Sequence, residues 1–146
     1  SNTDGVSVNT NLGSNFILGG QIKGQETEMM MIYPVGNYIR ASEIKRFFQL
    51  GETKYGKPIL DRLIRNETSL GDAARCALVS FDSTMKSDLT VGPPIDLVVY
   101  KKDSIQISLE EHLQFKTPFF SDLSSKWSEG LRNLFKELPK FDWEKD

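Results

Sequence analysis

The stretch Ser69–Tyr100, SLGDAARCALVSFDSTMKSDLTVGPPIDLVVY, decides the fold, because a long amphipathic helix is followed there by a strand. Ser69 is a good N-cap, and Asp72 three residues later completes a variant of the capping box. Gly92-Pro93-Pro94 ends the helical region, and IDLVVY has the composition of a strand. One face of the helix carries apolar residues at three- and four-residue spacing: Leu70, Ala73, Ala74, Ala77, Leu78, Phe81 and Met85.

Upstream of this stretch the pattern is that of short strands. Residues 1–15 are polar and predict a leader or loop. A short helix is predicted from Pro58, which suits a first helical turn, to about Asn66. Four strands of an antiparallel sheet are predicted before it: Phe16–Ile22, Met29–Gly36, Tyr38–Ala41 and Phe47–Gly51.

Downstream, the segment Ile95–Leu109 predicts two strands joined by a tight turn at Lys102-Asp103. A last helix is expected over Ser121–Leu138, with Pro139 as its stop and residues 139–146 as a tail. The order of strands, two helices, strands and a helix indicates one α+β domain over residues 1–146.

Composition excludes several classes of function. The 18 basic and 20 acidic residues give a net charge of −2, which argues against nucleic-acid binding. No apolar run approaches the roughly 20 residues that span a membrane. One cysteine, Cys76, and one histidine, His112, supply neither a disulfide nor a His/Cys metal cluster. We therefore expect a cytoplasmic protein without a metal ion or cofactor.

Other chemical motifs are weak. Neither Gly19-Gly20 with Gly24 nor GETKYGKP has the spacing of a nucleotide-binding loop. His112 is interpreted as a surface or capping residue between a strand and a loop, and Cys76 as a buried thiol. The run Met29-Met30-Met31 is interpreted as strand core or interface.

The polar segment SFDSTMKSD, Ser80–Asp88, raises the question of a site. Asp82 is predicted near the C-terminal end of the long helix, where the macrodipole disfavours a carboxylate by roughly 0.3–1 kcal/mol. Lys86 at i+4 offers a compensating pair worth about 0.2–0.5 kcal/mol. The residues alone leave both a polar helix end and a catalytic contribution open.

Longer motifs resemble a known family. FILGGQIKG, YPVGNYIRA, QLGETKYGKPILDR and the Ser69–Tyr100 stretch are together similar to Anbu, a family of bacterial proteasome-type proteases related to the proteasome beta subunit. The resemblance covers Phe16 to Ser108 and continues more weakly into the last helix. It implies an N-terminal-nucleophile (Ntn) hydrolase fold, an αββα sandwich, of which this chain resembles the C-terminal part only.

The resemblance implies a threonine or serine peptidase that hydrolyses peptide or amide bonds. In such enzymes the hydroxyl of the first mature residue attacks, and its α-amino group, with a reference pKa of about 7.7–8.0, takes the proton. We expect this nucleophile to lie in an N-terminal half that is missing here. Ser1 and Thr3 are poor substitutes, because nothing after them resembles the family's start.

The family also has an aspartate after its long helix, followed three residues later by a serine. Asp82 is matched to that aspartate; Met85 then stands at the serine position, so the hydroxyl role passes to Ser83 or Ser87. Glu52 and Lys54 occupy the loop that approaches the nucleophile in proteasomes, and a surface pair is favoured over a substrate-groove role.

Three functions follow as expectations. The first is a peptidase subunit that assembles with itself into a ring or helical homo-oligomer around peptide substrate. The second is a non-catalytic, self-assembling structural subunit. The third is an Ntn amidohydrolase that acts on small amides.

Overall fold

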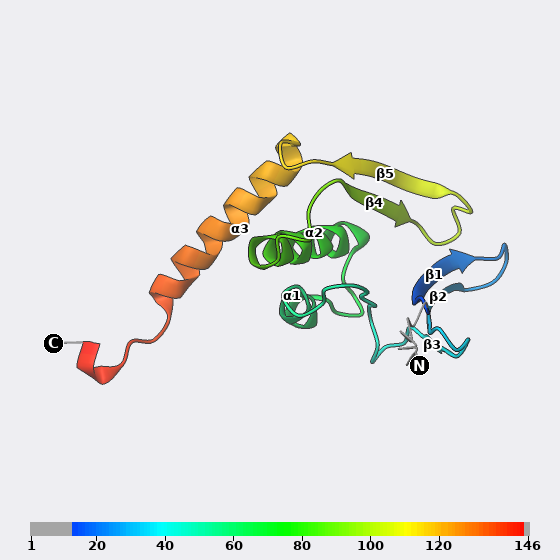
Figure 1. Cartoon of the computed structure of the whole chain (residues 1–146), viewed down its shortest axis with the longest axis horizontal. Coiled ribbons are helices and arrows are strands. Elements are labelled where there is room, and N and C mark those ends of the chain that lie inside the picture. The colour runs from blue at the N-terminus through cyan, green and yellow to red at the C-terminus, as the bar shows by residue number, and fades with distance from the viewer. Residues whose placement is uncertain (1–12, 145–146) are drawn as a thin grey trace, which may run out of the picture.

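A computed structural model describes residues 13–144 and confirms the predicted order of strands, two helices, strands and a helix (Figure 1). The chain is therefore α+β, as expected. Its elements are β1 (Phe16–Gln21), β2 (Thr27–Ile32), β3 (Tyr38–Arg40), α1 (Lys57–Leu63), α2 (Leu70–Ser87), β4 (Ile95–Tyr100), β5 (Ile107–Leu113), α3 (Pro118–Glu137) and a 3-10 turn, Asp142–Glu144.

The first sheet has three strands rather than the predicted four. Strands β1, β2 and β3 pair antiparallel in that order, with Phe16 opposite Ile32. The prediction of a strand over Phe47–Gly51 was wrong, because this segment is irregular. Phe47 packs against the cluster of Leu60, Ile64 and Cys76, so its apolar surface is covered by helices instead of pairing in a sheet.

The second sheet is the β4–β5 hairpin, in which Ile95 lies opposite Leu113. The predicted turn at Lys102-Asp103 was too short, since the strands are joined by residues 101–106. Asp103 and Ile105 both have positive φ values in this loop, 65° and 49°. Strand β5 begins at Ile107 and extends to Leu113. It includes His112, which the sequence had placed between a strand and a loop.

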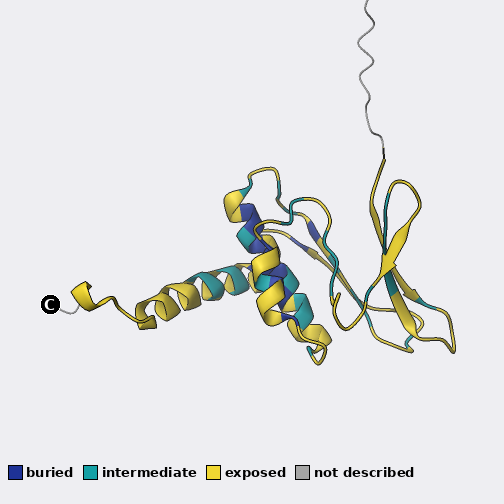
Figure 2. Cartoon of the chain, turned by 90° about the horizontal axis from the view of Figure 1, so that it is seen from below, coloured by how far each residue is buried: buried dark blue, intermediate teal, exposed yellow. Residues whose placement is uncertain are grey.

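Helix α2 is the centre of the packing. As predicted, Ser69 caps it: the Ser69 hydroxyl accepts a hydrogen bond from the Asp72 backbone N–H at 3.1 Å. The buried residues lie along α2 and on the elements that cover it (Figure 2). The main core cluster joins three elements to α2 and consists of Leu78, Met85, Ile95, Leu113 and Phe120.

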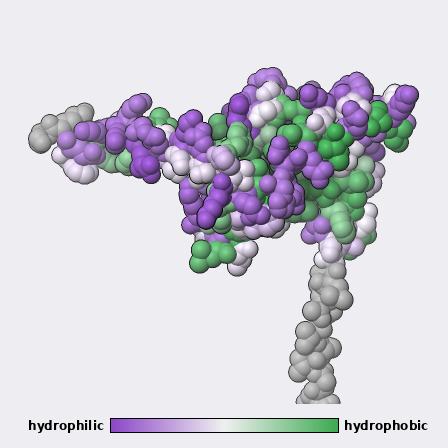
Figure 3. Space-filling model, turned by 90° about the horizontal axis from the view of Figure 1, so that it is seen from above, coloured by the Kyte–Doolittle hydropathy of each residue, from purple (hydrophilic) through white to green (hydrophobic). Residues whose placement is uncertain are grey.

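The strand end of the molecule keeps much apolar surface open to solvent. Phe16, Ile17 and Leu18 of β1 are exposed, and hydrophobic residues gather over this end in Figure 3.

Helix α3 begins at Pro118 rather than Ser121, because a proline is well accommodated in a first helical turn. Among the described residues, no helix is both long and apolar enough to cross a membrane.

The close approach of α1 to α2 predicts a steric effect at Gly56. A Cβ atom at Gly56 would lie 3.0 Å from the Ser80 Cβ and 3.1 Å from the Ser80 carbonyl oxygen. Overpacking of this kind costs about 1–3 kcal/mol, so Gly56→Ala is expected to lower the free energy of unfolding in a denaturant titration. Gly130→Ala in α3 is the matched control: a Cβ there meets nothing within 4 Å, and alanine favours the helix by about 0.5–1 kcal/mol. Equal effects of the two variants would contradict the proposed contact.

Candidate functional site

Asp82 lies inside α2 and connects this helix to α3. Asp82 as a whole is only 5% exposed. The carboxylate accepts a hydrogen bond from Lys86 Nζ at 2.8 Å and another from Ser124 Oγ at 2.5 Å. Lys86 Nζ also donates to Ser128 Oγ at 2.8 Å. A buried carboxylate is thus held by a cation on its own helix and a hydroxyl on the next helix.

This arrangement corrects the predicted position of Asp82. Helix α2 continues to Ser87, so Asp82 lies more than one turn before its end, and the macrodipole penalty is confined to the last turn. The predicted pair with Lys86 is confirmed. Ser83 is half-buried and Ser87 is exposed, and neither side chain makes a hydrogen bond within the part of the chain described here.

The hydroxyls that do reach the Asp82–Lys86 pair were missed by sequence reasoning. Ser124 is 42 residues from Asp82, and no local spacing connects the two. The sequence contained one indication that these two hydroxyls are special. Ser124 and Ser128 lie one turn apart and interrupt an apolar face of α3 that contains Phe120, Trp127 and Leu131.

The first residue after α2 is Asp88, which makes a second polar group. Its carboxylate oxygen Oδ1 accepts hydrogen bonds from Thr90 Oγ1 at 2.7 Å and from the Thr90 backbone N–H at 2.8 Å. Both bonds lower the pKa of Asp88 below its usual value, and the bond from the Thr90 hydroxyl has the larger effect. The charge of Lys54 lowers this pKa further. Asp88 is therefore an aspartate held as a carboxylate directly after the long helix.

The loop before α1 approaches the same end of α2. Glu52 Oε1 accepts from the Lys54 backbone N–H at 3.2 Å, and Lys54 Nζ lies 3.6 Å from Glu52 Oε2. The predicted surface pair is thus confirmed. The Glu52 side chain also lines a groove shared with Ser80, Thr84 and Val91. The loop, the end of α2 and the segment after it therefore surround one concave surface.

The remaining candidates have structural explanations. His112 Nδ1 lies 2.7 Å from Asp96 Oδ1 across the β4–β5 hairpin, and both side chains are exposed, which confirms the surface interpretation. Cys76 is buried as predicted, and burial raises the pKa of its thiol, so it is a poor nucleophile. Ser1 and Thr3 lie outside the described residues.

Searches of known proteins give matches among solved structures only. No protein-family model matches the chain, and no curated protein matches it either. Anbu from Hyphomicrobium sp. strain MC1 is 49% identical, with a TM-score of 0.84 over 88% of this chain. An Anbu described as an ancestral beta-subunit, from Yersinia bercovieri, is 43% identical, with a TM-score of 0.85 over 88% of this chain.

This chain is similar to Anbu over most of its own length. A third Anbu, from Pseudomonas aeruginosa and described as a helical assembly, is 43% identical, with a TM-score of 0.88 over 99% of this chain. The chain spans 55% of the Hyphomicrobium Anbu, 55% of the Yersinia Anbu and 60% of the Pseudomonas Anbu. These levels of identity confirm the resemblance seen in the sequence motifs.

The Asp82 network predicts a measurable coupling between α2 and α3. Hydrogen bonds to charged groups contribute about 1.5–3 kcal/mol, so Ser124→Ala and Lys86→Met are each expected to lower the free energy of unfolding by a comparable amount. Because both bind one carboxylate, the double variant should lose less than the sum of the single variants. Additive losses in this double-mutant cycle would rule out a shared network.

The Asp88–Thr90 contact predicts a change in titration. Thr90→Val removes the hydroxyl bond and leaves the backbone bond, so the pKa of Asp88 should rise toward its usual value. A lowered folded-state pKa stabilises the protein above the unfolded pKa, and this stabilisation is lost as the pH falls through the folded pKa. The variant should therefore have a smaller contribution from Asp88, and the loss of that contribution should be complete at a higher pH. Carboxyl chemical shifts followed by NMR would measure it, with Thr68→Val as the control, and an unchanged Asp88 pKa would refute the assignment.

Proposed function

We propose that this chain is the C-terminal part of a proteasome-type subunit with an Ntn-hydrolase sandwich. The observation that carries the proposal is the 49% identity and TM-score of 0.84 with an Anbu structure over 88% of the chain. The open strand end supports it, because apolar residues such as Phe16 and Leu18 need a further layer to cover them. In the proposed sandwich, α1, α2 and α3 supply one helical layer.

The proposed activity is hydrolysis of peptide or amide bonds by a threonine or serine nucleophile at the N-terminus of the mature subunit. That nucleophile and its α-amino base would lie in a segment upstream of this chain. The full protein is proposed to act in the cytoplasm on peptide substrates and to assemble with copies of itself. A relative described as a helical assembly supports self-assembly.

The position of Asp88 matches that of the family's supporting aspartate better than the position of Asp82 does. The family pattern places this residue after the long helix, and Asp88 is the first residue after α2. Its carboxylate is already ordered by Thr90, and the Glu52 loop lies at the same end of α2. We therefore assign to Asp88 the role of orienting the nucleophile. Asp82 is assigned a positioning role through α3, and the roles of Ser83 and Ser87 stay predictions.

One observation favours the alternative of a non-catalytic assembly subunit or a small-amide hydrolase. The residue three positions after Asp88 is Val91, where the family pattern has a serine. The loop Gly51–Lys54 likewise carries Glu52 in place of a serine. Fewer hydroxyls near the nucleophile leave its amine less well hydrogen-bonded, which weakens it as a base for peptide cleavage.

Kinetics of the full-length protein would test these roles. Asp88→Asn keeps the size of the side chain and removes its charge, and misplacement of a reacting group costs on the order of 10²-fold in rate. We expect a loss of kcat of this order for Asp88→Asn on a peptide or small amide. The matched variant Asp82→Asn should instead lower the free energy of unfolding and change kcat less.

A first mature residue other than threonine, serine or cysteine would overturn the peptidase proposal. So would turnover that persists when that residue is replaced by alanine. Turnover of small amides without peptides would select the amidohydrolase.

A further inference from the structure

The face of α3 that packs on α2 continues past the end of the contact. In the first half of the helix this face is covered: Phe120 is 2% exposed, Ser124 binds Asp82 and Ser128 binds Lys86. One and two turns further along the same face, α2 no longer covers the helix, and the second half of α3 extends away from the body (Figures 1 and 2).

The second half of this face is apolar and exposed. Its four residues follow the i, i+3, i+4 and i+7 spacing of a helix that binds in a groove. Phe141 and Trp143 extend the apolar surface, with ring centroids 5.7 Å apart in a stacked arrangement. We call these four residues, three in α3 and one at its C-cap, the distal stripe: Leu131, Leu134, Phe135 and the C-cap Leu138, with exposed fractions of 48%, 57%, 74% and 50%.

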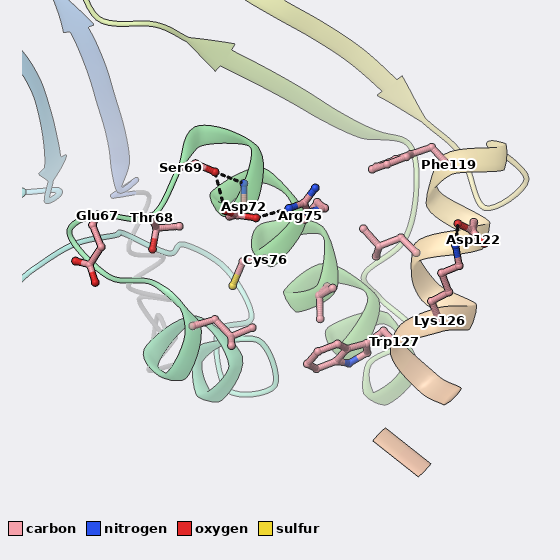
Figure 4. Close-up of a pocket in the computed structure, with 13 residues that line it drawn as sticks. Glu67, Thr68, Ser69, Asp72, Arg75, Cys76, Phe119, Asp122, Lys126 and Trp127 are labelled. Carbon is pink, nitrogen blue, oxygen red and sulfur yellow. Dashed lines mark hydrogen bonds and ion pairs between the residues drawn. The ribbon is translucent and has the colours of Figure 1, made fainter. Parts of the chain in front are cut away.

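The chain also presents an open groove of about 740 Å³ between α1, α2 and the first half of α3 (Figure 4). The donor atom Trp127 Nε1 is buried in its wall and has no acceptor among the described residues. Acidic side chains, Glu67, Asp72 and Asp122, lie on the rim with Arg75 and Lys126. The apolar residues that line the groove are Leu63, Cys76, Val79, Phe119, Leu123 and Trp127.

The distal stripe cannot occupy the groove of its own chain. Phe119, Leu123 and Trp127 of the first half of α3 form one wall of the groove, and α3 is one uninterrupted helix from Pro118 to Glu137. The stripe and the wall are therefore fixed parts of the same helix, and the stripe extends away from its own groove. Any contact between the two surfaces joins two molecules.

We propose that the distal stripe of one copy docks in the α1–α2–α3 groove of a second copy. Charge supports this orientation, because Arg132 and Lys136 directly follow stripe residues and flank the stripe, and Glu67 lies on the groove rim without an ion pair among the described residues. The contact joins two different surfaces and is heterologous, so it repeats from copy to copy as a ring or an open helical array. This inference deepens the proposed self-assembly by naming its surfaces.

Paired charge substitutions in the full-length protein would test the stripe. Phe135→Glu places a charge on the stripe, and Asn133→Glu places the same charge on another face of the helix. Phe135 is 74% exposed in a single copy, so a fall in melting temperature that occurs for Phe135→Glu and not for Asn133→Glu is expected only from lost association. We expect Phe135→Glu to shift the molar mass by light scattering to smaller species and Asn133→Glu to retain the wild-type mass. Equal masses for the two variants, or a monomeric wild type, would overturn the proposal.

Cross-linking would test the groove. We expect a mixture of Glu67→Cys protein and Phe135→Cys protein to give dimers with a short bismaleimide, and the variant with both cysteines to give a ladder. Each single variant alone is the control for the native Cys76, which is buried. Efficient dimers from Phe135→Cys alone would show a stripe-to-stripe contact and overturn the proposal. Both assays read mass and not turnover, so their failure is distinguishable from failure of the peptidase proposal.

Discussion

The carboxylate of Asp82 is the group on which the arrangement of the helices depends. It is buried between α2 and α3, and a buried carboxylate requires a cation and hydrogen-bond donors to offset the loss of hydration. Lys86 supplies the charge and Ser124 the second donor. Together with Phe120, which lies in one buried cluster with Leu78 and Met85 of α2, these bonds hold α3 across α2. The direction of the second half of α3, and the position of the distal stripe, follow from this contact.

The C-terminal end of α2 and the part of the helix before it serve different purposes. At its C-terminal end, Asp88, Thr90 and the Glu52–Lys54 loop form a small polar group beside a groove, the arrangement that the family resemblance associates with support of a nucleophile. Along its middle, Asp82 satisfies its hydrogen bonds toward α3. Two aspartates six positions apart in one polar segment thus face different neighbours, because Asp82 lies within α2 and Asp88 lies in extended backbone directly after it.

Much of the fold was predictable from local patterns. The capping residue Ser69, the apolar period of α2 and the Gly92-Pro93-Pro94 break identify the central helix and the strand after it. The segment Phe47–Gly51 was not predictable in the same way, since a short apolar run suits a strand as well as an irregular segment packed on helices. The length of the β4–β5 loop was also missed, because Asp103 and Ile105 adopt positive φ values that favour glycine and that the sequence does not signal.

The sequence by itself determined the helices, most strands, the α+β class and the Anbu resemblance, because these depend on residues that are neighbours along the chain. It also identified the Asp82–Lys86 pair, which is a contact within one helix. Only the tertiary structure decided that Asp82 faces Ser124 of α3, that Asp88 is the aspartate after the helix, and that the distal stripe has no partner within the described chain. The Asp82–Ser124 contact and the uncovered stripe depend on how α3 crosses α2, and packing between distant segments is not encoded in any local spacing. The position of Asp88 depends instead on where α2 ends.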